Sequence, residues 1–110
     1  MFSGCKALDT LNVSQWNVGN VQEMNATFSG CSALKSLDVS GWNVEKVNNF
    51  TEMFKNCSVL TSLDVSEWKT SKATLMGSMF YYCENLAILD VSKWDVGTVT
   101  AMNLMFFKCT

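Results

Sequence analysis

One block of the sequence recurs every 26 residues without a gap, and this repeat limits the folds available to the chain. Its consensus is M-F-x-x-C-x-x-L-x-x-L-D-V-S-x-W-x-V-x-x-V-x-x-M-x-x. Cysteines stand at 5, 31, 57, 83 and 109, phenylalanines at 2, 28, 54, 80 and 106, and tryptophans at 16, 42, 68 and 94. A fixed period of this length, held by the large apolar residues, predicts a solenoid whose units pack on their neighbours.

The repeat divides the chain into units at about 1–26, 27–52, 53–78 and 79–104, with a partial unit at 105–110. No linker or second domain interrupts them, so we expect a single repeat segment. Both ends fall inside a unit, and neither carries the polar capping unit that closes a stable repeat array. We therefore expect a piece of a longer repeat protein, with uncapped ends that can associate end to end.

The first half of each unit alternates apolar and polar residues, as in Leu37-Asp38-Val39-Ser40. Alternation with period two is typical of a short strand with one buried face, here Leu37 and Val39 inward and Asp38 and Ser40 outward. The spacing L-x-x-L-x-V-x-x-W-x-V also matches the leucine-rich-repeat template, with Trp replacing Asn or Cys. Strands of successive units should pair as a parallel sheet.

The second half of each unit changes period. Val21, Met24, Phe28 and Cys31 are spaced by 3, 4 and 3, which predicts one apolar stripe along a helix. The later stripes are Val47, Phe50, Phe54 and Cys57; Ala73, Met76, Phe80 and Cys83; and Val99, Met102, Phe106 and Cys109.

The residues at either end of each stripe are typical of helix caps. Asn20, Ser71 and Thr98 precede the stripes as candidate N-caps, and Gly4, Gly30 and Asn56 follow the Phe as candidate left-handed C-caps. Tyr82 and Lys108 occupy that C-cap position in the later units and predict a different ending there. Together the two halves predict an α/β repeat: a leucine-rich-repeat-like solenoid of 26-residue strand–turn–helix units with a parallel sheet on the concave face.

Composition argues against several functional classes. The net charge is −2 and no basic run is present, so a nucleic-acid partner is not expected. No apolar run approaches the roughly 18–20 residues that span a bilayer. The chain lacks histidine, which excludes Ser-His and Cys-His nucleophiles, and it lacks a Gly-rich phosphate loop. We expect a protein that is not an enzyme and binds no cofactor or metal.

Cysteine and tryptophan each have two interpretations. The five cysteines share one repeat position, without histidine or C-x-x-C spacing, so buried free thiols are favoured over disulfides or a zinc site. The four tryptophans form a ladder that would either stack sugar rings or close one edge of the core. Because Trp replaces the inward Asn of the template, the core is favoured.

Two polar columns are the candidates for binding. Asn12, Asp38, Asp64 and Asp90 share one position beside Ser14, Ser40, Ser66 and Ser92. They would either bind a partner or hydrogen-bond locally, with the Asp on turn amides and the Ser on the main chain of the neighbouring unit. One Asp per unit is too few ligands for calcium. A second column, Gln15, Gly41, Glu67 and Lys93, varies strongly between units, as a binding surface does. The candidate binding surface is therefore Asn12, Asp38, Asp64, Asp90, Gln15, Glu67 and Lys93.

The repeat resembles that of BspA-like leucine-rich surface proteins, which occur mostly on bacteria. The matching residues are L-D-V-S-x-W-x-V-x-x-V-x-x-M-x-x-M-F, and the likeness covers the whole chain; Asn12, Thr27 and Ala73 are mild departures. The resemblance implies an extracellular or surface-attached protein, often an adhesin, with no shared active site. We expect a non-catalytic scaffold that binds a protein or glycan on a host or neighbouring cell. The alternative is a structural stalk or spacer whose parent protein binds elsewhere.

Overall fold

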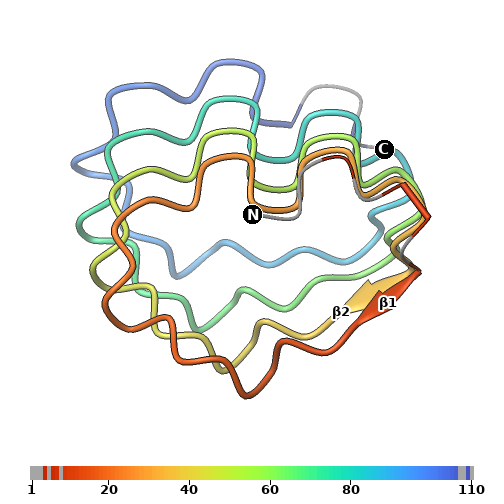
Figure 1. Cartoon of the computed structure of the whole chain (residues 1–110). Coiled ribbons are helices and arrows are strands. Elements are labelled where there is room, and N and C mark those ends of the chain that lie inside the picture. The colour runs from red at the N-terminus through yellow and green to blue at the C-terminus, as the bar shows by residue number, and fades with distance from the viewer. Residues whose placement is uncertain (1–3, 5, 8, 107–108, 110) are drawn as a thin grey trace.

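The computed structural model describes residues 4, 6–7, 9–106 and 109, and in it the chain winds through coils that lie one upon the next (Figure 1). The strands are β1 (Thr10–Leu11) and β2 (Ser36–Leu37), which pair in parallel with Thr10 opposite Ser36 and Leu11 opposite Leu37. The molecule measures 34 × 30 × 22 Å.

Elsewhere the coils are joined by single parallel bridges. These bridges pair Glu23 with Asn49, Asn49 with Leu75, Leu75 with Ala101, and Ser62 with Ile88. Each pair is separated by 26 residues, the same register as β1 and β2. Neighbouring coils therefore place equivalent residues side by side along the whole described chain.

The side of each coil opposite the strands rises and falls in rectangular steps, visible along the upper edge of Figure 1. Alternate backbone N–H groups point to the next coil: Phe28 donates to the Met53 carbonyl (2.8 Å) and Phe54 to the Met79 carbonyl (2.9 Å). The intervening N–H groups bond within their own turn, as in Cys57 to the Phe54 carbonyl (3.2 Å). About half of the N–H groups on this side of the coil thus donate to carbonyls of the neighbouring coil.

The predicted α/β solenoid of strand–turn–helix units with a parallel sheet is wrong. Among the residues that the structure describes there is no helix, and the strands are two residues long. The segments whose apolar residues are spaced by 3, 4 and 3 form the stepped side of the coils. There, successive backbone N–H groups donate alternately to the carbonyl three residues back and to a carbonyl of the next coil. A continuous ladder of bonds to the fourth residue back, which defines an α-helix, cannot form there.

Left-handed residues cause the steps. Three stepped segments contain two of them, four residues apart: Ala26 with Gly30, Glu52 with Asn56, and Ser78 with Tyr82. The first position is held by Ala26, Glu52, Ser78 and Leu104, and the second by Gly4, Gly30, Asn56 and Tyr82. A non-glycine residue in this conformation costs about 1–2 kcal/mol, and the hydrogen bonds to the next coil offset that cost.

The predicted caps fare differently. Gly4, Gly30 and Asn56 are left-handed as predicted, although no helix precedes Gly30 or Asn56, and Tyr82 adopts the same conformation where a different ending was expected. Asn20, Ser71 and Thr98 cap no helix; Thr98 instead donates its hydroxyl to the Ala73 carbonyl (2.7 Å). Lys108 lies outside the described residues.

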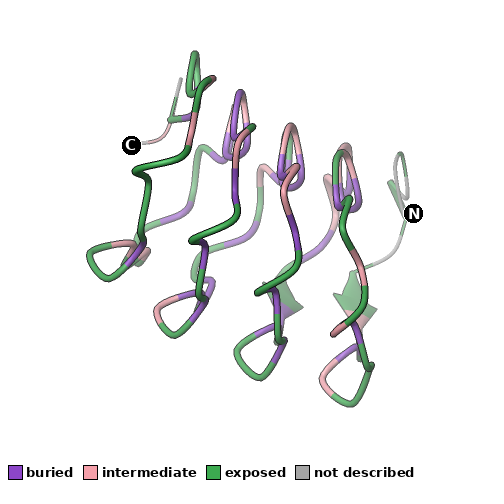
Figure 2. Ribbon diagram, turned by 90° about the vertical axis from the view of Figure 1, so that its left-hand side faces the viewer, coloured by how far each residue is buried: buried purple, intermediate pink, exposed green. Residues whose placement is uncertain are grey.

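The core lies between the stepped side and the strand side of the coils, where the buried segments line up from coil to coil (Figure 2). Phe28, Phe54, Phe80 and Phe106 stack in one column, with successive ring centroids 5.6 Å apart and nearly parallel. From the other side, Leu37 and Val39 point into the same core and are buried, as predicted.

The tryptophan ladder belongs to this core. Trp42, Trp68 and Trp94 are buried, which confirms the predicted packing role for these three. Each indole N–H donates to a carbonyl in the preceding coil at 2.9 Å: Trp42 to Val13, Trp68 to Val39 and Trp94 to Val65. Trp16 differs, being 41% exposed. The ladder therefore fixes the register between coils as well as filling space.

The left-handed backbone predicts the effect of adding a methyl group at two glycines. Gly30→Ala should lower the free energy of unfolding by about 1–2 kcal/mol, because φ is +78° and the new Cβ would meet the Gly4 backbone at 3.3 Å. Gly41→Ala is the control: its Cβ meets nothing within 4 Å, so stability should stay level or rise slightly. Urea unfolding measures both, and equal effects would contradict the left-handed geometry at Gly30.

Candidate functional site

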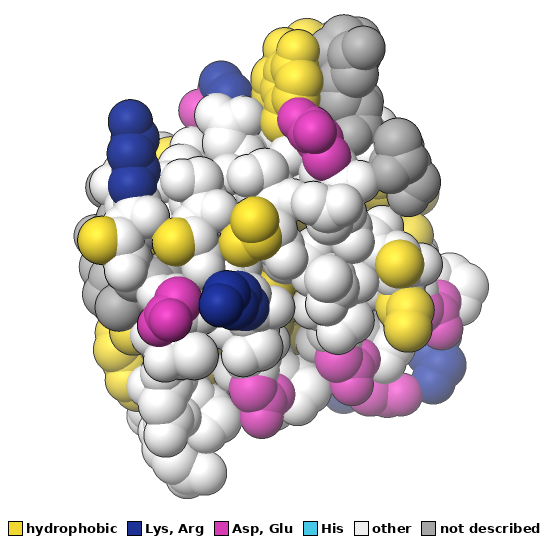
Figure 3. All heavy atoms as spheres, turned by 90° about the vertical axis from the view of Figure 1, so that its right-hand side faces the viewer, with side chains coloured by type: hydrophobic (Ala, Val, Ile, Leu, Met, Phe, Trp, Pro, Cys, Tyr) yellow, Lys and Arg dark blue, Asp and Glu magenta, His cyan; other side chains and the backbone are white. Residues whose placement is uncertain are grey.

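All seven residues of the candidate binding surface are exposed. Figure 3 shows one face of the molecule, on which acidic and basic side chains stand among uncharged polar groups and hydrophobic side chains appear as separate areas. The repeat brings the seven residues, together with Gly41, into two columns. We call them the aspartate column (Asn12, Asp38, Asp64 and Asp90) and the variable column (Gln15, Gly41, Glu67 and Lys93).

Every member of the aspartate column closes the same local turn. The Oδ1 atom of Asp64 accepts hydrogen bonds from the backbone N–H (3.1 Å) and the hydroxyl (2.7 Å) of Ser66. Asp38 and Asp90 do the same with Ser40 and Ser92. The predicted bond from Asp to the turn amide is confirmed. The Ser prediction was wrong, because these hydroxyls bond to the Asp of their own turn and not to the neighbouring main chain.

These bonds favour the charged form of the three aspartates. The Ser66 hydroxyl, and then its N–H, hold the pKa of Asp64 below the ordinary value of 3.8, and the same donors lower the pKa of Asp38 and Asp90. Neighbouring Asp carboxylates oppose this shift at Asp64 by repulsion. The three aspartates are therefore ionised at neutral pH and present negative charge in successive coils.

A shallow groove of about 430 Å³ runs beside the column. Three successive coils line it: Thr10, Leu11, Asn12 and Ser14 from the first, Ser36, Leu37 and Asp38 from the second, and Ser62 and Asp64 from the third. Because the groove crosses the coils, it suits an extended ligand better than a compact one. Its walls offer hydroxyl, amide and carboxylate groups for hydrogen bonding.

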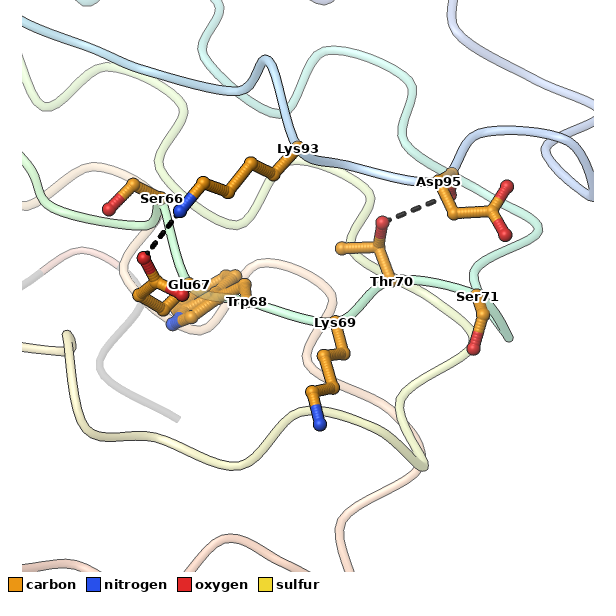
Figure 4. A pocket seen from close by; sticks show the side chains of 8 residues that line it. All are labelled: Ser66, Glu67, Trp68, Lys69, Thr70, Ser71, Lys93 and Asp95. Carbon is orange, nitrogen blue, oxygen red and sulfur yellow. Dashed lines mark hydrogen bonds and ion pairs between the residues drawn. The ribbon is translucent and has the colours of Figure 1, made fainter.

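The variable column contains an ion pair between neighbouring coils. Lys93 Nζ lies 2.8 Å from Glu67 Oε1 above a hollow of about 370 Å³, which is also lined by Trp68, Lys69 and Asp95 (Figure 4). Glu67 raises the pKa of Lys93 by hydrogen bonding and charge. Both side chains remain mostly exposed, so solvent screens the pair and it adds little to stability.

Two features of this region escaped sequence reasoning. The first is pairing between coils: Lys93 with Glu67, and Lys69 with Glu45 at 3.2 Å. Opposite charges at one repeat position were a usable signal for the first pair. The second is Thr70, which is buried and donates its hydroxyl to the Asp95 carbonyl of the next coil at 2.9 Å. In the sequence, Thr70 stands at a position where the other units have Val, and this difference indicated a special role.

The cysteines are free thiols where the structure describes them. Cys31, Cys57 and Cys83 are buried and Cys109 is partly buried, as predicted; Cys5 lies outside the described residues. Each thiol of Cys57, Cys83 and Cys109 donates to the carbonyl of a Phe 29 residues earlier, at 2.9–3.2 Å. Burial raises the pKa of Cys83 to about 12 and carries that of Cys57 well above its ordinary range. Such thiols are poor nucleophiles at neutral pH.

Within the described ranges, no cluster of three or more His, Cys, Asp or Glu side chains is arranged to hold a metal ion. In the same part of the chain, no helix has the length and apolar character needed to cross a membrane.

One protein family matches this sequence. The family model described as "Mycoplasma protein of unknown function, DUF285" covers residues 1–110. Neither the curated proteins nor the solved structures yielded a match to the chain.

The Asp–Ser turn predicts a titration result. Ser66→Ala removes the hydroxyl that contributes most to the lowered pKa of Asp64, so that pKa should rise, as followed by carboxyl NMR signals during acid titration. Because the folded pKa lies below the unfolded one, this carboxylate's stabilisation is present above about pH 4 and is lost as the pH falls. Ser62→Ala is the control, and an equal shift from it would contradict a specific role for Ser66.

Thiol burial predicts slow alkylation. At pH 8, iodoacetamide should modify Cys83 far more slowly in the native protein than in urea, because the folded thiol is buried and protonated. The folded pKa of Cys83 exceeds the unfolded one. The contribution of this thiol to stability should therefore be fully present below about pH 9 and be lost between pH 9 and about 12. Mass spectrometry locates the label, with the partly buried Cys109 as internal comparison. Labelling of Cys83 at the unfolded rate would contradict the burial.

Proposed function

Since this chain belongs to the family of Mycoplasma proteins of unknown function, we propose that it is a non-catalytic scaffold that binds a macromolecule outside the cell. The more specific part of the proposal is that it is BspA-like and forms part of a surface adhesin. The resemblance of the 26-residue repeat to BspA-like proteins supports an extracellular or cell-surface location. The partner would be a protein or a glycan on a host or neighbouring cell.

The observation that carries this proposal is the groove beside the aspartate column. It is lined by polar groups from three coils, and Asp38 and Asp64 remain ionised within it. Regularly spaced carboxylates and hydroxyls can bind an extended partner through hydrogen bonds and charge, namely a peptide with basic residues or a glycan chain. Glu67 and Lys93 extend this surface beyond the groove and vary its charge from coil to coil.

A structural stalk is the second candidate, and one observation favours it. The Asp–Ser hydrogen bonds are nearly identical in the coils, with hydroxyl distances of 2.7, 2.7 and 2.6 Å at Asp38, Asp64 and Asp90. Side chains already occupied with closing a turn are needed for folding whether or not a ligand binds. Under this alternative the column serves the repeat alone, and binding resides in another part of the parent protein.

A charge-neutral variant separates the two functions. In Asp38→Asn/Asp64→Asn the turn bonds should survive, because Asn12 already makes the same bonds to Ser14 in the first coil. We expect this variant to lose most of the binding that the wild type shows to a panel of extracellular-matrix proteins and glycans. The measurement is surface plasmon resonance at physiological salt.

The matched control is Glu23→Gln/Glu52→Gln, which also removes two negative charges but lies outside the groove. It should bind as the wild type does. Equal loss in both variants would show that only net charge matters, and unchanged binding in the aspartate variant would contradict the proposed site. No binding by the wild type to any member of the panel would favour the stalk.

A further inference from the structure

The third coil (residues 53–78) departs from the repeat at three successive positions that follow its tryptophan. Lys69 stands where the other three coils have Asn or Asp, Thr70 where they have Val, and Ser71 where they have Gly or Glu. This is an inner coil, with hydrogen bonds to a described coil on each side. Its surface is therefore set by neighbours that are present in the structure.

Lys69 replaces a side chain that closes a turn. In the other coils, the Asn or Asp at this position accepts a hydrogen bond from the backbone N–H two residues later. These pairs are Asn17 with Gly19 (3.1 Å), Asn43 with Glu45 (3.0 Å) and Asp95 with Gly97 (2.9 Å). A lysine side chain has no acceptor and cannot make this bond. Its ammonium group lies instead 3.2 Å from the Glu45 carboxylate, at the surface.

All three departures line the hollow of about 370 Å³ beside the Glu67–Lys93 pair. Figure 4 shows Glu67 and Lys93 on one side of this hollow and Asp95 and Ser71 on the other. Thr70 ties the two coils together beneath it through its bond to the Asp95 carbonyl. The differences between the third coil and the others thus gather at one place on the surface.

The charges around this hollow are balanced. Two ammonium groups (Lys69 and Lys93) and two carboxylates (Glu67 and Asp95) line it. Among the described residues, Glu67 accepts a hydrogen bond at Oε1 and Asp95 at Oδ1, so each carboxylate keeps a second oxygen that can accept from a ligand. A strongly charged ligand would meet a like charge here. A neutral ligand with several hydroxyl groups can accept from the ammonium groups and donate to the carboxylates at the same time.

We propose that this hollow binds a neutral glycan, whose hydroxyl groups accept from Lys69 and Lys93 and donate to Glu67 and Asp95. The inference rests on the proposed binding function, but it names the class of ligand and places it outside the groove beside the aspartate column.

The space available suits a short stretch of a glycan chain. The hollow lies at the lower end of the roughly 300–1,000 Å³ range of small-molecule sites. A smaller hollow of about 230 Å³ continues over the second coil and shares Glu67 and Lys69 with it. A longer chain can therefore lie across both hollows.

Restoring the repeat sequence in the third coil tests the inference. Lys69→Asn/Ser71→Gly introduces the residues of the first coil, where Asn17 and Gly19 form the turn, so this variant should fold. The probes are cellotetraose, maltotetraose, mannotetraose and chitotetraose, titrated into isotope-labelled protein and followed by NMR. We expect the wild type to bind at least one of them and the variant to bind it about ten-fold more weakly or less, because two donors are lost.

Two further readings locate the ligand and define its charge. In the wild type, the amide signals of Lys69, Ser71 and Asp95 should shift during the titration. The affinity should be the same in low and high salt, because a neutral ligand makes no ion pair that salt can screen. Affinity that falls with salt would contradict a neutral ligand.

Leu75→Asn is the matched control, since it also introduces the residue of another coil, Asn49, but lies outside the hollow. This control and Asp38→Asn/Asp64→Asn should both bind the tetrasaccharide as the wild type does. If circular dichroism shows that Lys69→Asn/Ser71→Gly is unfolded, Lys93→Gln replaces it, with the same expected loss.

Three results would overturn the inference: no tetrasaccharide bound by the wild type, equal affinity in the variant of the hollow, or a matching loss in either control. The proposed function fails separately. A wild type that binds a matrix protein but no tetrasaccharide removes the glycan site alone, whereas a wild type that binds neither removes both.

Discussion

Hydrogen bonding between adjacent coils in one fixed register is the constraint on which the structure depends. With strands only two residues long and no helix among the described residues, a single coil cannot satisfy its own backbone. Alternate N–H groups, the indoles of Trp42, Trp68 and Trp94, and the thiols of Cys57 and Cys83 all bond to a carbonyl in an adjacent coil. A change of register would break all of these bonds together. It would be costly in free energy, because buried polar groups are destabilising when they are left unpaired.

The same register produces the candidate site. Equivalent side chains stand in columns, so the same chemical group is presented several times along a line. Local hydrogen bonds from Ser66 and its equivalents lower the pKa values of the carboxylates in the aspartate column, and at Asp64 they outweigh the repulsion from the neighbouring Asp side chains. The variable column differs in charge between coils, and its Glu67–Lys93 pair links two of them. The register thus separates the side chains that pack between coils from those that stand exposed in columns on the surface.

Sequence patterns predicted the buried positions well and the backbone poorly. Leu37, Val39 and Trp42 were assigned to the core because period-two alternation and the Trp spacing report burial directly. The stripe that includes Met24, Phe28 and Cys31 is also buried, yet a 3-4-3 spacing arises in a stepped segment as readily as in a helix. What distinguishes a stepped segment from a helix is a left-handed residue at the position of Ala26, Glu52 and Ser78. The sequence has no glycine at that position to indicate this conformation. For the site, exposure, the Asp turns and the Glu67–Lys93 pair left signals in the sequence, whereas the Ser partners and the Lys69–Glu45 pair depend on side-chain geometry.

The most direct test of this account is the partner of one backbone amide. Scalar couplings across hydrogen bonds, measured by NMR on isotope-labelled protein, identify which carbonyl accepts from the Phe54 N–H. The structure predicts a coupling to the carbonyl of Met79, in the next coil. A coupling to the carbonyl of Phe50, four residues back, would show that this segment is an α-helix and would contradict the account.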